Sequence, residues 1–91
     1  MKHVRVVENK IVVLDCPAEG IPFPNVTWFK DEEPIELNER VRLLMSDRRL
    51  EVSLARESDS GWFTCMADNV VGSANMNFNL TVIGNEFRHL T

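Results

Sequence analysis

Several residue types and patterns that would point to particular functions are scarce or missing in this chain of 91 residues. Its two histidines, His3 and His89, stand at opposite ends without other ligands at metal-binding spacing, so we expect no metal site and no other cofactor. No apolar run is long enough to cross a bilayer, and we expect no direct membrane insertion. Ten Lys and Arg against fourteen Asp and Glu give a net charge of −4, which argues against nucleic-acid binding.

Catalytic groups in a workable arrangement are also missing from the sequence. A nucleophile needs an adjacent base and a base needs an orienting partner, whereas the serines here lie in predicted turns. We therefore expect no enzymatic activity from this domain, although a parent protein could still carry a kinase or phosphatase domain. The acidic stretch Asp31-Glu32-Glu33 suits either a cation site or a solvated turn, and the lack of further oxygen ligands favours the turn.

What the sequence does contain is a repeated alternation of apolar and polar residues with the period of β-strands. Turn signals such as the segment 20–24 separate these strands, and no segment between them has a helical period. The length accommodates one modest core, so we predict a single domain over residues 1–83 and the start of a C-terminal linker at 84–91. The pattern predicts an all-β antiparallel sandwich with strands within residues 4–16 (broken at 8–10), 26–30, 41–45, 50–54, 62–68 and 74–83.

The two cysteines, Cys16 and Cys65, have inward parity within their predicted strands, and Trp28 lies between them in the sequence. This order of Cys, Trp and Cys resembles that of immunoglobulin domains. The resemblance covers nearly the whole chain, is closest to repeats of hemicentin and neural adhesion receptors, and extends next to titin-like muscle repeats. It implies an immunoglobulin-like sandwich of seven to nine strands. Three segments carry the similarity to the intermediate set of this family, namely Leu50 to Cys65, Cys65 to Gly72 and Gly20 to Trp28.

This resemblance also implies structural roles for particular residues. It implies a disulfide between Cys16 and Cys65, worth about 4 kcal/mol on the chain-entropy model, with Trp28 packed against it. It further implies an ion pair between Asp59 and an arginine, for which Arg40 is the equivalent residue and Arg42 is the alternative on the same face. The remaining structural residues of this set are Leu50, Val52, Gly61 and Phe63.

Phe63 departs from the family pattern, and the chain has no tyrosine at all. The tyrosine of related domains bonds through its hydroxyl to the backbone upstream. Phe63 cannot make this hydrogen bond, whose loss costs about 1 kcal/mol. We therefore expect a looser corner at this point of the sandwich.

Strand parity raises a question about Trp62. If Phe63 and Cys65 point into the core, then Trp62 and Met66 point outward, and Phe29 is turned outward by the inward position of its neighbour. Aromatic residues are enriched at the centres of protein interfaces, so Phe29, Trp62 and Met66 are a candidate interface. The alternative is that Trp62 merely covers neighbouring side chains, because single exposed apolar residues are common.

Four arginines, at positions 40, 42, 48 and 49, gather on one predicted hairpin of an otherwise acidic chain. Such a group suits a sulfated glycosaminoglycan or an acidic partner. The alternative, which we favour, is that Arg40 is engaged by Asp59 and that the others pair with Glu39, Asp47 and Glu51.

Two glycosylation sequons, at Asn25 and Asn79, have outward parity and favour an extracellular location. Two functions stay open. The first is a protein-binding or adhesion module in the ectodomain of a receptor or in a matrix glycoprotein, with a homophilic or heterophilic partner or a tandem immunoglobulin domain. The second is a cytoplasmic structural repeat, as in titin-like muscle or cytoskeletal proteins, with free thiols and bare asparagines.

Overall fold

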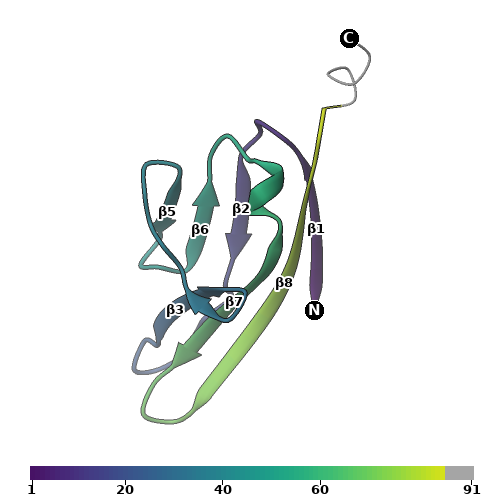
Figure 1. The fold of residues 1–91 in the computed structure, drawn as a ribbon. Coiled ribbons are helices and arrows are strands. Elements are labelled where there is room, and N and C mark those ends of the chain that lie inside the picture. The colour runs from purple at the N-terminus through teal and green to yellow at the C-terminus, as the bar shows by residue number, and fades with distance from the viewer. Residues whose placement is uncertain (86–91) are drawn as a thin grey trace.

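A computed structural model, which describes residues 1–85, shows two β-sheets packed face to face (Figure 1). The larger sheet, here called the large sheet, has five strands within these residues. Their order across the sheet is β1 (Lys2–Val7), β8 (Ser73–Ile83), β7 (Gly61–Asp68), β3 (Asn25–Lys30) and β4 (Glu33–Pro34). Neighbouring strands of the small sheet are β2 (Val12–Asp15), β6 (Arg49–Val52) and β5 (Val41–Leu44). One short 3₁₀ turn, η1 (Glu57–Asp59), leads into β7.

The predicted all-β sandwich is confirmed, and the predicted strands coincide with observed ones to within one or two residues. Two details differ from the prediction. The acidic turn contains a short strand, because Glu33 and Pro34 pair with Lys30 and Phe29. The first strand, β1, pairs with β8 in parallel rather than antiparallel. Alternation reports which side of a strand is buried, but it carries no information on the direction of the neighbouring strand.

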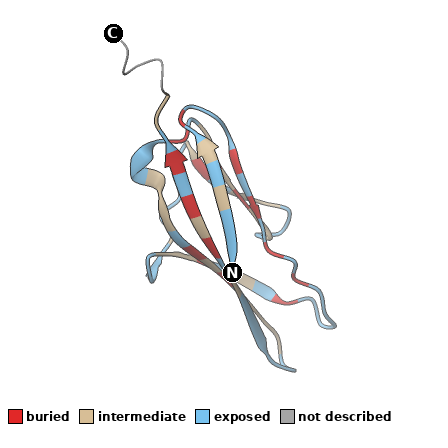
Figure 2. Cartoon of the chain, turned by 90° about the vertical axis from the view of Figure 1, so that its right-hand side faces the viewer, coloured by how far each residue is buried: buried red, intermediate tan, exposed pale blue. Residues whose placement is uncertain are grey.

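The core lies between the sheets and follows the strand period. Figure 2 views the molecule from the side of β1 and β8, and buried bands alternate with more exposed ones along β8. Trp28, Leu50, Val52, Phe63 and Cys65 are all at most 2% exposed. These five are among the residues to which the family resemblance assigned structural roles, and their burial is consistent with a place in the core.

A disulfide joins Cys16 to Cys65 across the two sheets, with the two Cα atoms 6.1 Å apart. Trp28 is 1% exposed, and its ring centroid lies 5.8 Å from that of Phe78 in a stacked arrangement. The Trp28 indole Nε1 donates a hydrogen bond of 2.7 Å to the carbonyl oxygen of Asp47. Both the apolar and the polar parts of this large side chain are therefore satisfied inside the sandwich.

The C-terminal strand ends at Ile83, and Gly84 and Asn85 follow it. The rest of the predicted linker, residues 86–91, lies outside the described residues, and so does His89. Over residues 1–85, no helix is long and apolar enough to cross a membrane.

The disulfide closes a loop with a sequence separation of 49 residues. Replacing both Cys16 and Cys65 by alanine should lower the free energy of unfolding by about 4 kcal/mol, because the unfolded chain regains the entropy of the open loop. Urea denaturation of the oxidised protein and of the double variant measures the difference. The reduced wild-type protein is the control and should match the variant. A loss below about 1 kcal/mol would contradict the expectation.

Candidate functional site

The outer face of the large sheet, meaning the face that points away from the small sheet, carries the predicted interface residues. Along β7, Phe63 and Cys65 are buried, whereas Trp62 and Met66 are 47% and 36% exposed. Phe29 on the neighbouring strand β3 is half-buried. The structure thus brings the three residues to one face, as strand parity requires.

Register shows how these residues lie relative to one another. Phe29 is directly opposite Thr64, which lies between Trp62 and Met66 on β7. Phe29 is therefore a diagonal neighbour of both, at a separation that aromatic and long side chains span. The Thr64 hydroxyl donates a hydrogen bond of 2.8 Å to Asn77 Oδ1 on β8. The candidate interface is accordingly an apolar triangle around a polar centre, and it is not an unbroken apolar patch.

Asp31 holds the backbone of Trp62 from both sides. The Trp62 amide donates to Asp31 Oδ1 at 2.9 Å, and the Asp31 amide donates to the Trp62 carbonyl at 2.7 Å. Asp31 and Glu32 have φ angles of 49° and 71°, so the turn between β3 and β4 is left-handed despite the absence of glycine there. The two residues line a shallow hollow beside the indole. Sequence reasoning missed this clamp, because it joins residues 31 positions apart.

Gly61 is the position that lets Asp31 approach so closely. Its φ is 153°, and a Cβ built on it would lie 2.9 Å from both carboxylate oxygens of Asp31. A side chain at this position would both strain the backbone and push the carboxylate away from Trp62. Glycine at residue 61 therefore contributes to the position of the exposed tryptophan as well as to the turn.

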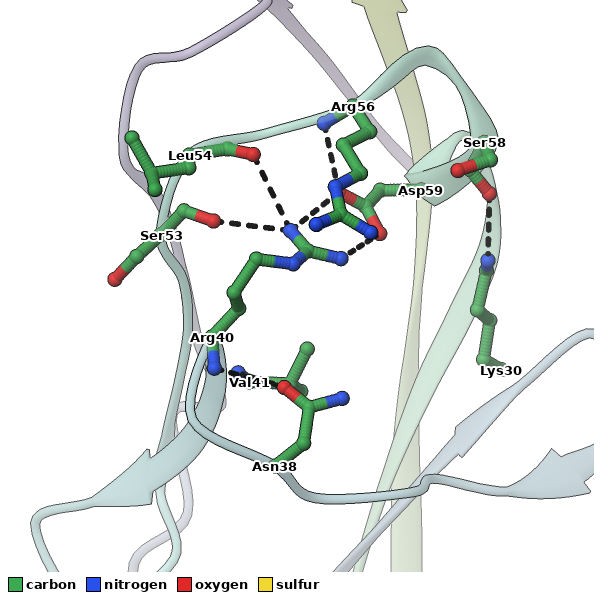
Figure 3. Close-up of polar contacts among 9 residues, drawn as sticks. All are labelled: Lys30, Asn38, Arg40, Val41, Ser53, Leu54, Arg56, Ser58 and Asp59. Carbon is green, nitrogen blue, oxygen red and sulfur yellow. Dashed lines mark hydrogen bonds and ion pairs between the residues drawn. The ribbon is translucent and has the colours of Figure 1, made fainter.

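At the end of the sandwich where η1 lies, the Arg40 guanidinium meets Asp59 (Figure 3). Its two terminal nitrogens each donate to one carboxylate oxygen at 3.0 Å. Arg40 Nη1 also donates to the carbonyl oxygens of Ser53 and Leu54. Burial alone would raise the pKa of Asp59, but hydrogen bonds from Arg40 and from the Arg56 amide, with the Arg40 charge, hold this pKa below its ordinary value. The alternative partner Arg42 bonds to Glu51 instead.

The remaining arginines of the predicted basic group are also engaged. Arg49 pairs with Asp15 at 2.7 Å, a partner outside the expected set of Glu39, Asp47 and Glu51. The Arg48 guanidinium lies 5.3 Å from the ring centroid of Phe23. The expected partner was wrong because Asp15 is far from Arg49 in the sequence. Asp15 on β2 lies opposite Arg49 on β6 only after folding. Each arginine of the group has a contact, which weakens the case for a sulfate-binding surface.

Lys30 lies at the corner where related domains have a tyrosine. Its Nζ is 5.8 Å from the ring centroid of Phe63 and donates a hydrogen bond of 3.1 Å to the carbonyl oxygen of Ser58. A cation at this distance from an aromatic face is attracted to it. Lys30 therefore connects β3 to η1 by a hydrogen bond. The expectation of a looser corner did not consider this contact.

The two sequon asparagines occupy different parts of the outer face. Asn25 begins β3 and pairs with Asp68, whereas Asn79 on β8 pairs with Trp62. Glycosylation at either position stays a prediction. Within residues 1–85, no group of three or more His, Cys, Asp or Glu side chains is arranged to hold a metal ion.

Two packed sheets joined by a central disulfide and a buried tryptophan define an immunoglobulin-type β-sandwich, a class whose domains are interaction modules rather than catalysts. The sequence model of the immunoglobulin I-set domain family matches residues 1–82, and the chain belongs to this family.

The individual matches include one curated relative and two solved structures. Hemicentin-1 of Homo sapiens is 39% identical over 82 residues, which is 90% of this chain and 2% of that protein. The four N-terminal immunoglobulin domains of Dscam1 isoform 9.44 match with a TM-score of 0.86 and 28% identity, over 92% of this chain and 22% of that one. Titin domain M7 matches with a TM-score of 0.80 and 27% identity, over 90% of this chain and 86% of that one. The chain thus spans a small part of the curated relative.

The ion pair of Arg40 and Asp59 should make stability depend on pH. Because the folded pKa of Asp59 lies below the unfolded value of about 3.9, its contribution is complete above that pH and is lost as the pH falls through the folded pKa. We expect Asp59→Asn to lose about 1–3 kcal/mol at pH 7, and the gap to the wild type to close below about pH 4.

Urea denaturation between neutral and acidic pH measures this gap. Asp15→Asn is the matched control, because it removes the exposed pair with Arg49 and should cost less than about 1 kcal/mol. A gap for Asp59→Asn that stayed constant with pH would show that the ion pair is not its origin.

Proposed function

We propose that this domain is a recognition module of a cell-surface or matrix protein, and that it binds a protein partner through the outer face of the large sheet around Trp62. The observation that carries the proposal is the 47% exposure of Trp62 on a backbone clamped by Asp31. A tryptophan is costly to leave in water, and truncating one at an interface centre is often among the largest losses of affinity. A clamped backbone also lowers the entropy lost on binding.

Several observations support an extracellular location. A disulfide joins Cys16 to Cys65, and such bonds persist in oxidising compartments. Both sequon asparagines lie on the outer face. The threonines of the two sequons, Thr27 and Thr81, are exposed. The similarity to Hemicentin-1 and to Dscam1 adds support by analogy. A neighbouring immunoglobulin domain of the same chain is a second kind of partner for the module.

The cytoplasmic structural repeat is the alternative, and one feature of the fold favours it. Strands β1 and β8 pair in parallel over Lys2–Val7 and Phe78–Ile83. A force that pulled the N-terminus and the C-terminus apart would load this ladder in shear, across all of its hydrogen bonds together. The match to titin domain M7 supports this alternative by analogy.

A non-reducing peptide map of the parent protein from its own tissue separates these two functions. The recognition module predicts a bridged Cys16–Cys65 pair and glycan on Asn25 or Asn79. Free thiols together with two bare asparagines would overturn the extracellular function and favour the structural repeat. Mass spectrometry after digestion without reductant gives both readouts.

The role of Trp62 can be tested with fluorescent tetramers of the oxidised, glycan-free domain from bacteria, applied to the extracellular matrix and cell surfaces of that tissue. Trp62→Ala should weaken binding at least about 30-fold, as expected for an interface hot spot. Val13→Ala is the matched control, because Val13 is 44% exposed on the small sheet, and it should change binding less than about twofold. Unchanged binding with lowered stability for Trp62→Ala would assign Trp62 to packing alone.

A further inference from the structure

The register between β7 and β8 places Asn79 directly opposite Trp62. Residues in this position have Cβ atoms about 4.5–5.5 Å apart and point to the same side of the sheet. On its other side Asn79 pairs with His3 of β1, so it lies between two neighbouring strands on the outer face. The two features that sequence analysis treated separately, a sequon and an exposed tryptophan, are therefore cross-strand neighbours.

Asn79 is also available for modification. Its side chain is half-buried and has no hydrogen-bond partner among residues 1–85, whereas Asn77 and Asn69 use their side chains as acceptors. Thr81, the hydroxyl residue of the sequon, is exposed and lies on the same face. A hollow lined by His3, Arg5, Asn79 and Thr81 lies on one side of the amide, and the hollow beside Trp62 lies on the other. An attached sugar would find room at the surface.

We propose that Asn79 carries an N-linked glycan whose first sugar packs over the indole of Trp62, so that glycan occupancy closes this part of the outer face to protein partners. In the transfer step, Asn79 Nδ2 bonds to the anomeric carbon of an oligosaccharide held on a lipid diphosphate. The bond from that carbon to the diphosphate breaks, the lipid diphosphate leaves with the electron pair, and the amide proton passes to a base of the transferase.

The chemistry of the two rings supports the contact. An aromatic face is the negative part of the ring quadrupole, and the C–H groups on the face of a sugar ring are weakly positive. Packing of the sugar would also remove apolar area of a 47% exposed tryptophan from water. The backbone that carries the indole is held in place, because Asp31 bonds to both backbone groups of Trp62.

The second sequon supplies an internal comparison. Asn25 pairs with Asp68, which lies six positions from Trp62 along β7, or about 20 Å at the rise of a strand. A first sugar on Asn25 is therefore too far away to cover Trp62. Only the glycan of Asn79 is expected to change the surroundings of the indole.

The test uses the domain secreted from animal cells and trimmed by an endoglycosidase to one N-acetylglucosamine per site, with occupancy read by mass spectrometry. Acrylamide quenching of tryptophan fluorescence reports on Trp62, because Trp28 is 1% exposed. With the sugar on Asn79, the quenching constant should be about half that of the N79Q and T81A variants, since a stacked ring shields one indole face. N25Q is the matched control and should behave as the wild type.

Two outcomes would overturn the proposal. The first is equal quenching of the wild type and N79Q with Asn79 occupied. The second is a bare Asn79 in secreted protein whose Asn25 carries glycan. Thermal unfolding is a second readout. The sugar on Asn79 should raise the Tm of the wild type by about 2–6 °C and should leave the Tm of W62A unchanged.

The closing of the interface rests on the proposed function, and the tetramer assay separates the two. Glycosylated wild-type tetramers should bind at least about tenfold more weakly than N79Q tetramers made in the same cells. If N79Q and the double variant W62A/N79Q bind equally, the proposed interface fails, whatever the quenching shows. If N79Q binds through Trp62 and the glycosylated wild type binds as strongly, only the control by glycan fails.

Discussion

The disulfide between Cys16 and Cys65 is the constraint on which most of the structure depends. It ties the end of β2 to the middle of β7 across the core, where Trp28 is buried. Side chains on a strand alternate, so a fixed inward position at Cys65 determines the side of every other residue of β7. A slip by one residue would bury Trp62 and expose Phe63. The same crosslink that stabilises the core therefore also presents the tryptophan.

The backbone next to Trp62 and the turn that contacts it both have positive φ angles. Gly61 has a φ of 153°, and Asp31 has a φ of 49°. Both conformations are uncommon for residues with side chains, and both occur next to the hydrogen bonds between Asp31 and Trp62. The clamp is one support for the proposal that the outer face around Trp62 is an interface.

At the end of the sandwich that contains η1, charged side chains make contacts within the domain. The Arg40 guanidinium is engaged by Asp59 and by two backbone carbonyls, which leaves little of its charge for a partner. Lys30 bonds to Ser58 and lies over the ring of Phe63, where related domains have a tyrosine hydroxyl. Cations that appear in the sequence as a binding surface are thus used to join strands and turns.

The sequence by itself determined the strand segments, the inward positions of Cys16, Trp28 and Cys65, and the outward position of Trp62, because alternation and family spacing are local properties of the chain. Only the tertiary structure decided which residues face each other across strands. The pairs Asn79 with Trp62 and Asp15 with Arg49, and the clamp at Asp31, join segments far apart in sequence. Such contacts depend on register and on the order of strands in each sheet, which the period of a single strand does not encode.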